Sequence, residues 1–428
     1  MGLFGILSLV LVTAALFAWI NHRYVRLPTT IGVMLIALGM SLGLVGARFV
    51  GLDITDNVAE LLDRLDFKHL LLDVMLAFLL FAGSLHIDLN DLFGQKWVIS
   101  ILATAGVLLS TVLVGGMIWL ASGALGLDVD LAWCLVFGSL ISPTDPIAVL
   151  GILKSARAPK SLETKITGES LFNDGIGVVV FGVVLAIAIG GEPVTALDVA
   201  QDLLAEVGGA VLIGLVGGAL AYRMLRSVDD YKLEVLITLA LCTGAYSLAS
   251  ALHASGPIAV VLAGLLIGNT GRAYAMSETT VRHLDTFWEL VDEVLNVMLF
   301  VLIGMEVLVM SFELPHLLAG LVAIPLVLLS RLIAVSGTVS ALRFRREFTP
   351  HAVKIMTWAG LRGGISVALA LSIPDGLAAR ELIVSMTYVV VVFSIVVQGL
   401  TVGKLASLVP RNMPVDAPTD VPSGGNHP

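Results

Sequence analysis

Thirteen long apolar segments constrain this chain more than any other feature of its sequence. A helix needs about 20 apolar residues to cross the hydrocarbon core of a bilayer. The predicted spans are 3–20, 28–48, 70–88, 98–121, 131–153, 163–190, 203–224, 233–252, 256–269, 291–311, 315–341, 351–373 and 381–409. Only 13% of the residues are charged, against about 25% in soluble proteins. The sequence therefore predicts an all-α polytopic membrane protein.

The basic residues of the connecting loops predict the orientation of these spans. Lys and Arg gather in the cytoplasmic loops of membrane proteins. With the N-terminus outside, eighteen of the 24 Lys and Arg residues lie in inside loops or near the inside ends of spans, and four lie on the outside. The other two, Arg331 and Arg362, lie deeper within spans. This asymmetry supports thirteen spans, an outside N-terminus and a cytoplasmic C-terminus. The expected location is the plasma (inner) membrane.

The remaining segments are short. No Lys or Arg precedes Arg23, so we interpret the first apolar segment as a retained span rather than a cleaved leader. Residues 277–293, SETTVRHLDTFWELVDE, are expected to form an interfacial helix that leads into the tenth span. Residues 410–428 are rich in Pro, Gly and Asp, which predicts a short disordered cytoplasmic tail. We therefore expect one transmembrane domain over 1–409. The net charge of −9 gives no support for nucleic-acid binding.

A polar interruption lies in the fifth span, in the sequence SPTDP. Two prolines flank its centre, Pro143 and Pro146. Proline removes a backbone donor and clashes with the preceding turn, so this helix should break mid-membrane and leave carbonyls near Ser142 and Thr144 without partners. Unwound backbone is tolerated at that depth only where it is buried in protein or lines a cavity. The alternative is a plain proline kink with Asp145 as a helix cap.

The sixth span begins with a second polar group, GESLFND. Glu169 and Asn173 are four residues apart, and so are Ser170 and Asp174. Residues four apart share one face of a helix. These side chains offer oxygen ligands without sulfur or imidazole, which is the ligand set that hard cations prefer. The pattern predicts a cation site near the cytoplasmic end of the span. The alternative is a polar patch where the helix leaves the membrane.

The twelfth span contains Arg362, in the sequence GLRGGIS. A buried cation needs an anion as partner, and the glycines around Arg362 weaken the helix locally. This span runs from inside to outside, whereas the fifth runs from outside to inside. Two broken helices of opposite direction, near 131–153 and near 351–373, fit the inverted repeat of a secondary transporter.

Four motifs occur in one order along the chain: SPTDP, GESLFND, FVLIGME and GLRGGIS. With them the sequence resembles the monovalent cation/proton antiporters of the NhaP and NHE group, the CPA1-type Na⁺/H⁺ antiporters, over about residues 10–409. The resemblance implies a transporter rather than an enzyme, exchanging Na⁺, and also Li⁺, for H⁺ by alternating access. Exchange of K⁺ for H⁺ at the same site is the alternative.

The resemblance also implies the assembly. Relatives are homodimers in the lipid bilayer, so we expect core helices at about 98–190 and 315–409 and the remaining helices in a dimerisation and linker layer. No cofactor is expected, and the ligands are the transported cation and the proton. No nucleic-acid partner is expected.

Position by position, the resemblance implies a cation and proton site made of Asp174, Asp145, Ser170 and the main-chain carbonyl of Thr144. Asp174 is the residue implied to bind either a proton or a cation, and never both. Glu169 is implied to form an ion pair with Arg362. Asn173 stands where electrogenic relatives have a second aspartate, which implies electroneutral 1:1 exchange.

A remote alternative is an intramembrane aspartyl protease, because Asp145 and Asp174 lie on neighbouring spans and two aspartates can share a proton. The residues around both aspartates differ from the pattern of such proteases. A cation channel is a second rival, but channels build their filters from several subunits around one pore. The sequence leaves open the roles of Glu306, Arg331 and Asp73, and a structural pair between Glu306 and Arg331 is one expectation.

Overall fold

The computed structural model describes residues 3–48, 70–127, 129–146, 149–151, 153, 159–190, 196–308, 313–343, 348 and 350–407. Regular structure in these residues is helical, apart from an isolated bridge between Asp145 and Leu361. The predicted all-α architecture is therefore confirmed. The predicted tail over 410–428 lies outside the described residues.

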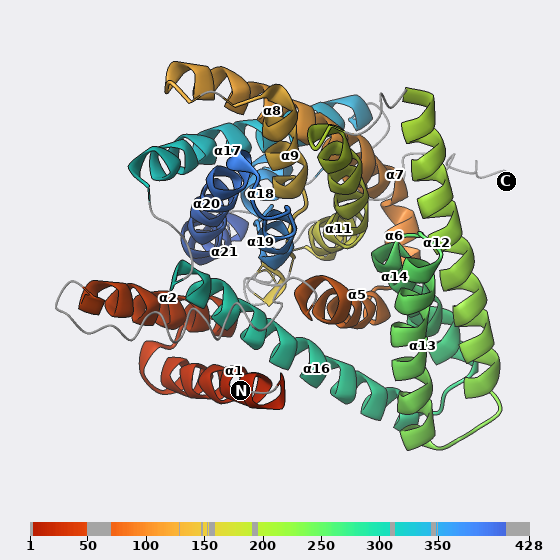
Figure 1. Ribbon diagram of the computed structural model, residues 1–428. Coiled ribbons are helices and arrows are strands. Elements are labelled where there is room, and N and C mark those ends of the chain that lie inside the picture. Colours follow the sequence, from red (N-terminus) through yellow and green to blue (C-terminus); the bar gives the residue numbers. More distant parts are fainter. Residues whose placement is uncertain are drawn as a thin grey trace, which may run out of the picture.

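The helices follow one another along the chain as Figure 1 labels them. The first part contains α1 (Leu3–Ile20), α2 (Thr29–Arg48), α5 (Leu76–Leu85), α6 (Leu89–Gly94), α7 (Lys96–Ile101), α8 (Val107–Ala124), α9 (Leu131–Ile141) and α11 (Lys160–Ala188). The second part contains α12 (Ala196–Leu225), α13 (Tyr231–Ala251), α14 (Gly256–Leu266), α15 (Arg272–Tyr274), α16 (Glu278–Met305), α17 (Leu314–Leu342), α18 (Ala352–Trp358), α19 (Gly364–Leu371), α20 (Ala378–Phe393) and α21 (Gly399–Ala406).

In the described ranges, five π-helical turns and one 3₁₀ turn join or extend these helices. The π turns are η1 (Asn21–Val25), η2 (Leu70–Met75), η3 (Leu102–Gly106), η4 (Ile267–Gly271) and η6 (Ser394–Gln398), and the 3₁₀ turn is η5 (Glu306–Leu308). A π turn inside a helix often accompanies a functional site. The turn η6 lies between α20 and α21, where it supports the second broken helix described below.

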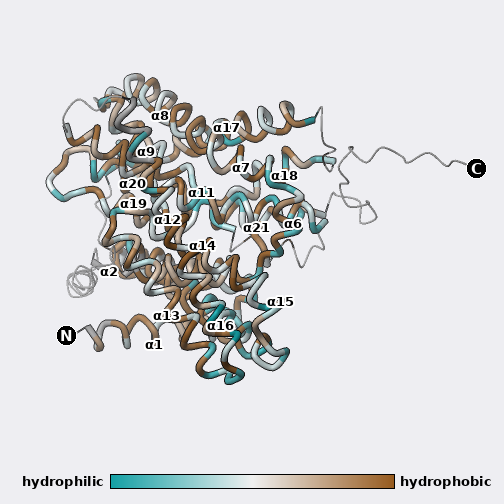
Figure 2. The backbone as a smooth tube through the Cα atoms, turned by 90° about the vertical axis from the view of Figure 1, so that its right-hand side faces the viewer, coloured by the Kyte–Doolittle hydropathy of each residue, from teal (hydrophilic) through white to brown (hydrophobic). Residues whose placement is uncertain are grey.

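Each of the thirteen predicted ranges contains helix. Within the described residues, nine helical stretches are long and apolar enough to cross a bilayer. The other four ranges hold the short apolar helices α5 and α9, the helix α16, and the pair α18 and α19. Figure 2 shows hydrophobic residues over most of the bundle and hydrophilic ones around α15 and α16.

The helix α16 differs from the expectation. The interfacial helix expected over 277–293 and the tenth span form one continuous helix of 28 residues. Ser277 caps its N-terminus, because the hydroxyl accepts a hydrogen bond from the backbone N–H of Thr280. The polar first turns of α16 therefore continue into its apolar part without a break. In Figure 1, α16 crosses the lower part of the molecule and packs against α2 and α5.

The centre of the molecule is built around α9. It packs against α8 and α11 on one side and against α19 and α20 on the other, while α17 crosses α8 and α20. The helices α12, α13 and α14 contact one another along one edge of the molecule, where α14 also packs against α5 (Figure 1). The polar segments of the fifth, sixth and twelfth spans thus meet in the interior.

Both predicted helix breaks are present, and they cross each other. The helix α9 ends at Ile141, two residues before Pro143, and α18 ends at Trp358, before the glycine-rich stretch that leads into α19. At the crossing, the backbone N–H of Asp145 donates to the carbonyl of Leu361 over 2.8 Å. The two unwound stretches therefore hydrogen-bond to each other.

The first break packs directly on α11, and this contact gives a test of the fold. A Cβ added at Gly177 would overlap the ring of Pro143, whereas a Cβ at Gly182, on the same helix, meets open space. Replacing Gly177 by Ala should lower the free energy of unfolding by about 1–3 kcal/mol, the usual effect of overpacking. The apparent Tm of the detergent-purified protein should therefore fall. Gly182→Ala is the control, and an equal fall in Tm for both variants would contradict the packing.

Candidate functional site

Three polar side chains meet where the first broken helix faces α11. The amide nitrogen of Asn173 donates to the hydroxyl of Thr144 over 2.8 Å, and the backbone N–H of Thr144 donates to the amide oxygen of Asn173 over 3.2 Å. The hydroxyls of Thr144 and Ser170 lie 3.0 Å apart. All three residues are buried. The prolines free the backbone around Thr144, and Asn173 takes over the bonds that a helix would have supplied.

Two carboxylates lie beside this cluster. Asp174 is one helical position from Asn173 on α11, it is 4% exposed, and its Oδ1 atom has no hydrogen-bond partner among the described residues. Asp145, in the first break, is close enough to interact with it electrostatically. A Cβ at Gly363 would overlap the Asp145 carboxylate, so this carboxylate lies against the backbone at the start of α19. The structure therefore brings Asp174, Asp145, Ser170 and Thr144 together.

Arg362 caps the end of the first broken helix. Its guanidinium donates to the carbonyls of Ser142 and Pro143, the latter over 2.7 Å. The carbonyl of Ser142 would normally accept from the residue four positions later, but that residue is Pro146, which has no N–H. A cation at this end also opposes the negative end of the helix dipole. Arg362, 2% exposed, thus supplies the hydrogen bonds that the prolines removed.

The predicted ion pair between Glu169 and Arg362 is wrong. The carboxylate of Glu169 instead accepts two hydrogen bonds from the guanidinium of Arg331, which projects from α17; the second, from Nη2 to Oε2, is 2.9 Å long. Both partners are buried. Backbone carbonyls engage the guanidinium of Arg362, and the guanidinium of Arg331 takes its place beside Glu169. Arg331 therefore pairs with Glu169 and not, as expected, with Glu306.

The other acidic residues lie elsewhere. Glu306 is buried in η5, at the far end of α16. Asp73 lies in η2, but its side chain is outside the described part of the structure.

Two polar side chains of η6, Ser394 and Gln398, form hydrogen bonds that support the second break, and these bonds were not expected from the sequence. The hydroxyl of Ser394 accepts from the backbone N–H of Arg362 over 2.9 Å and donates to the side chain of Gln398 over 2.6 Å. The amide nitrogen of Gln398 donates to the carbonyl of Trp358 over 3.0 Å. Ser394 and Gln398 are four residues apart, but such pairs are common in spans, so this spacing alone had no diagnostic value.

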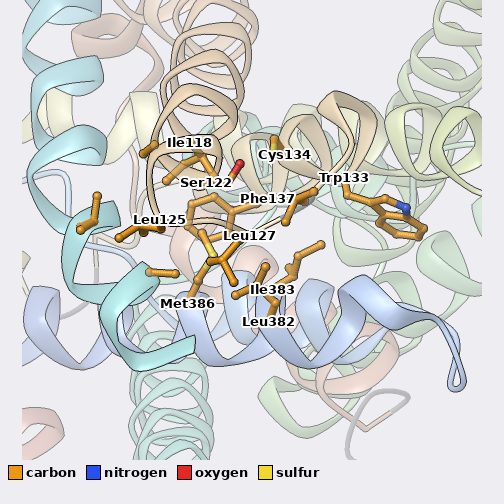
Figure 3. A pocket seen from close by; sticks show the side chains of 14 residues that line it. Ile118, Ser122, Leu125, Leu127, Trp133, Cys134, Phe137, Leu382, Ile383 and Met386 are labelled. Atoms are coloured by element: carbon orange, nitrogen blue, oxygen red, sulfur yellow. The ribbon is translucent and has the colours of Figure 1, made fainter. Parts of the chain in front are cut away.

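An apolar pocket between α8, α9 and α20 lies apart from the polar cluster (Figure 3). Its volume is about 20 Å³, and Phe137, Leu382 and Met386 are among the side chains that line it. None of the predicted site residues contributes to the lining. The candidate ion site is therefore the buried crossing of the broken helices, which offers oxygen ligands, and not this pocket.

Comparison with known proteins agrees with this geometry. The family model described as "Sodium/hydrogen exchanger, transmembrane" matches residues 11–408. This chain belongs to the sodium/hydrogen exchanger family. It is 49% identical to a protein named Na⁺/H⁺ antiporter NhaP of Pseudomonas aeruginosa, over 94% of this chain and 96% of that protein. It is 35% identical to the Na⁺/H⁺ antiporter NhaH of Halobacillus dabanensis, over 87% of this chain and 90% of that protein.

The exchanger fold extends to a solved structure. The sodium proton antiporter MjNhaP1 of Methanocaldococcus jannaschii superposes with a TM-score of 0.74 at 20% identity, covering 95% of this chain and 98% of that one. At this identity the match shows the fold alone. The predicted antiporter fold is confirmed by this match and by the family model.

The new pairing of Glu169 in this exchanger is testable by a double-mutant cycle. Glu169→Gln or Arg331→Gln alone leaves one charge buried and should lower the free energy of unfolding by about 3–5 kcal/mol. The double variant should lose less than the sum of the two, as measured by thermal unfolding in detergent. The exposed pair Lys160–Asp91, 2.6 Å apart, is the control and should couple by about 1 kcal/mol or less. Coupling of Glu169 to Arg362 but not to Arg331 would contradict the structure.

Proposed function

We propose that this protein exchanges Na⁺, and also Li⁺, for H⁺ across the membrane, with Asp174 binding either the cation or the proton. The observation that carries this proposal is the Oδ1 atom of Asp174, which is buried and accepts no hydrogen bond from any of the described residues. A buried carboxylate is unstable as an anion unless something neutralises it. A proton and a cation are the two available ligands, and one carboxylate accepts only one of them at a time. The printed names of the relatives, Na⁺/H⁺ antiporters, support the same exchange.

The oxygen ligands for the cation come from both sides of the crossing. Asp174 and Ser170 approach from α11, and Asp145 and the carbonyl of Thr144 approach from the first break. Hydroxyl, carbonyl and carboxylate oxygens are the ligands of hard cations. Asn173 would not bind the cation, because its amide already bridges to Thr144 on both edges. We assign it the role of holding the break against α11.

The charges around the site support electroneutral 1:1 exchange. Glu169 and Arg331 neutralise each other. Arg362 adds one positive charge and Asp145 and Asp174 add two negative charges, so the count at the crossing leaves a single negative charge for the ligand to neutralise. One proton or one monovalent cation does so equally. The loaded site is neutral in both forms, whereas the empty site is charged and crosses a low-dielectric barrier poorly.

Alternating access would move the crossing between the two sides of the membrane. We also propose the arrangement implied by the resemblance, a homodimer in the plasma (inner) membrane with core helices over about 98–190 and 315–409. The excess of basic residues in alternate loops supports an outside N-terminus and a cytoplasmic C-terminus.

The assignment of Asp174 predicts the result of one substitution. Asp174→Asn should abolish cation-driven proton movement in everted vesicles, measured with a ΔpH-reporting dye on adding Na⁺, Li⁺ or K⁺. The protein should still accumulate and keep its elution volume, because an amide fits the same space. Asp130→Asn is the control, since this exposed aspartate makes no side-chain cap to α9. Exchange at the wild-type rate in Asp174→Asn would refute the assignment, and a response to K⁺ alone would identify K⁺/H⁺ exchange.

Electroneutrality predicts how exchange responds to voltage. With K⁺ and valinomycin clamping the membrane potential of proteoliposomes, the initial rate of Na⁺/H⁺ exchange should stay the same at zero and at −100 mV. Moving one net charge through that potential would change the free energy by about 2.3 kcal/mol, which is easily seen in a rate. The variant Asn173→Asp adds a titratable group at the site and provides the comparison. A rate that follows the clamped potential in the wild type would refute the 1:1 ratio.

A further inference from the structure

One face of α16 changes from polar to apolar as it approaches the crossing of the broken helices. Asp292, Asn296, Leu299 and Ile303 are spaced by four, three and four residues, so they share a stripe along the helix. Leu299 and Ile303 belong to the central hydrophobic core. Leu299 also lies against Gly364, where a Cβ would overlap its side chain. The stripe therefore faces the start of α19, and its polar half lies toward the N-terminal end of α16.

Asn296 is unusual on this stripe. The residue is 1% exposed, yet its amide oxygen has no hydrogen-bond donor among the described residues. Buried polar atoms are almost always paired. An amide oxygen without a donor is a ready ligand for a cation, which needs oxygen lone pairs and no hydrogen.

Asp292 lies one turn before Asn296, within hydrogen-bonding reach of it. It is half-buried, and its carboxylate interacts electrostatically with Asp145 in the first break. In contrast, Asp285, two turns earlier on α16, is paired with Arg272. Among the described residues, no basic side chain forms an ion pair with Asp292. Asp292 thus lies near the first break, without an ion-pair partner among the described residues.

We propose that Asp292 and Asn296 form a second, transient binding site for the transported monovalent cation, on the route from the N-terminal end of α16 to Asp145 and Asp174. The carboxylate would attract a partly hydrated cation, and the amide oxygen would replace one of its waters. Fixed negative charge in a low-dielectric passage raises the local concentration of cations. The proposal rests on the proposed function, because it concerns the same cation and the same central site.

The proposed orientation places this end of α16 on the cytoplasmic side, so the site would serve one side only. Asp292→Asn removes the charge and keeps the shape. It should raise the apparent KM for Na⁺ by at least about threefold when Na⁺ is added to the cytoplasmic face, as in everted vesicles. The KM for Na⁺ at the opposite face, measured in right-side-out vesicles, should change much less, and the KM should change more than the maximal rate.

A matched control distinguishes a binding site at Asp292 from a general electrostatic effect of negative charge on α16. Glu293→Gln removes the same charge from the adjacent position, whose side chain is exposed and points away from the stripe. This variant should leave the KM at both faces near the wild-type value. The proposal is overturned if Glu293→Gln and Asp292→Asn have equal effects, if Asp292→Asn leaves the KM unchanged at both faces, or if it raises the KM equally at both.

Asn296 provides a second measurement, in which the first variant does not alter charge. Asn296→Ala removes the amide oxygen and should raise the KM at the cytoplasmic face only, so the proposal stays testable if Asp292→Asn fails to fold. Asn296→Asp adds a ligand charge and should lower that KM. If the wild type exchanges Na⁺ and Asp174→Asn does not, unchanged KM values in the α16 variants refute this site alone. If the wild type does not exchange Na⁺, the proposed function itself is refuted.

Discussion

The hydrogen bonds between the two broken helices are the interaction on which the rest of this structure depends. Inside a bilayer there is no water to satisfy an unwound backbone, and each unpaired group costs several kcal/mol. Here each break supplies what the other lacks. The N–H of Asp145 donates to the carbonyl of Leu361, and the side chain of Arg362 donates to the carbonyls of Ser142 and Pro143. Neither break would be stable without the other, so a single mutation in one break acts on both.

The pair of Glu169 and Arg331 fixes α11, the helix beside the two broken helices, relative to their crossing. Arg331 also donates to the carbonyl of Met356 in α18 over 3.3 Å. One guanidinium thus joins α11, α17 and α18 in the interior. Glu169 precedes Ser170 directly and Asp174 by little more than one turn, so anchoring Glu169 sets the rotation of α11 about its axis. Ser170 and Asn173 on α11 then face the first break. Apolar residues farther along the helix, such as Phe181, pack in the core.

The sequence predicts those parts of the site whose causes are local. Pro143 and Pro146 remove hydrogen bonds within their own helix, and the four-residue spacing of Ser170 and Asp174 places them on one face, so both features follow from neighbouring residues. The partner of Glu169 depends on the whole fold. Two buried arginines were available, and the choice was decided by backbone carbonyls that the break of α9 exposes to Arg362. A sequence pattern lists side chains and does not show which carbonyls have lost their donors.

The length of α16 was missed for a related reason. The charged residues over 277–293 indicated a helix at the membrane surface, but most of them lie on one side of a helix whose other side packs inward, where Leu284 and Trp288 are buried. Amphipathic and apolar segments can continue as one helix when the buried face is continuous. The same helix carries Asp292 and Asn296, which already lay within the predicted tenth span, 291–311.

The position of Arg362 bears on release as well as on binding. A carrier must let go of its cation on the far side, so the proposed site of two carboxylates and several neutral oxygens must not bind too tightly. The end of α9 adds a partial negative charge of about half an elementary charge to that set. Arg362, bound to the carbonyls of Ser142 and Pro143, opposes this partial charge at its source. Had Arg362 paired with Glu169 instead, those carbonyls would have remained as additional ligands, and the cation would have been held by the broken helix itself.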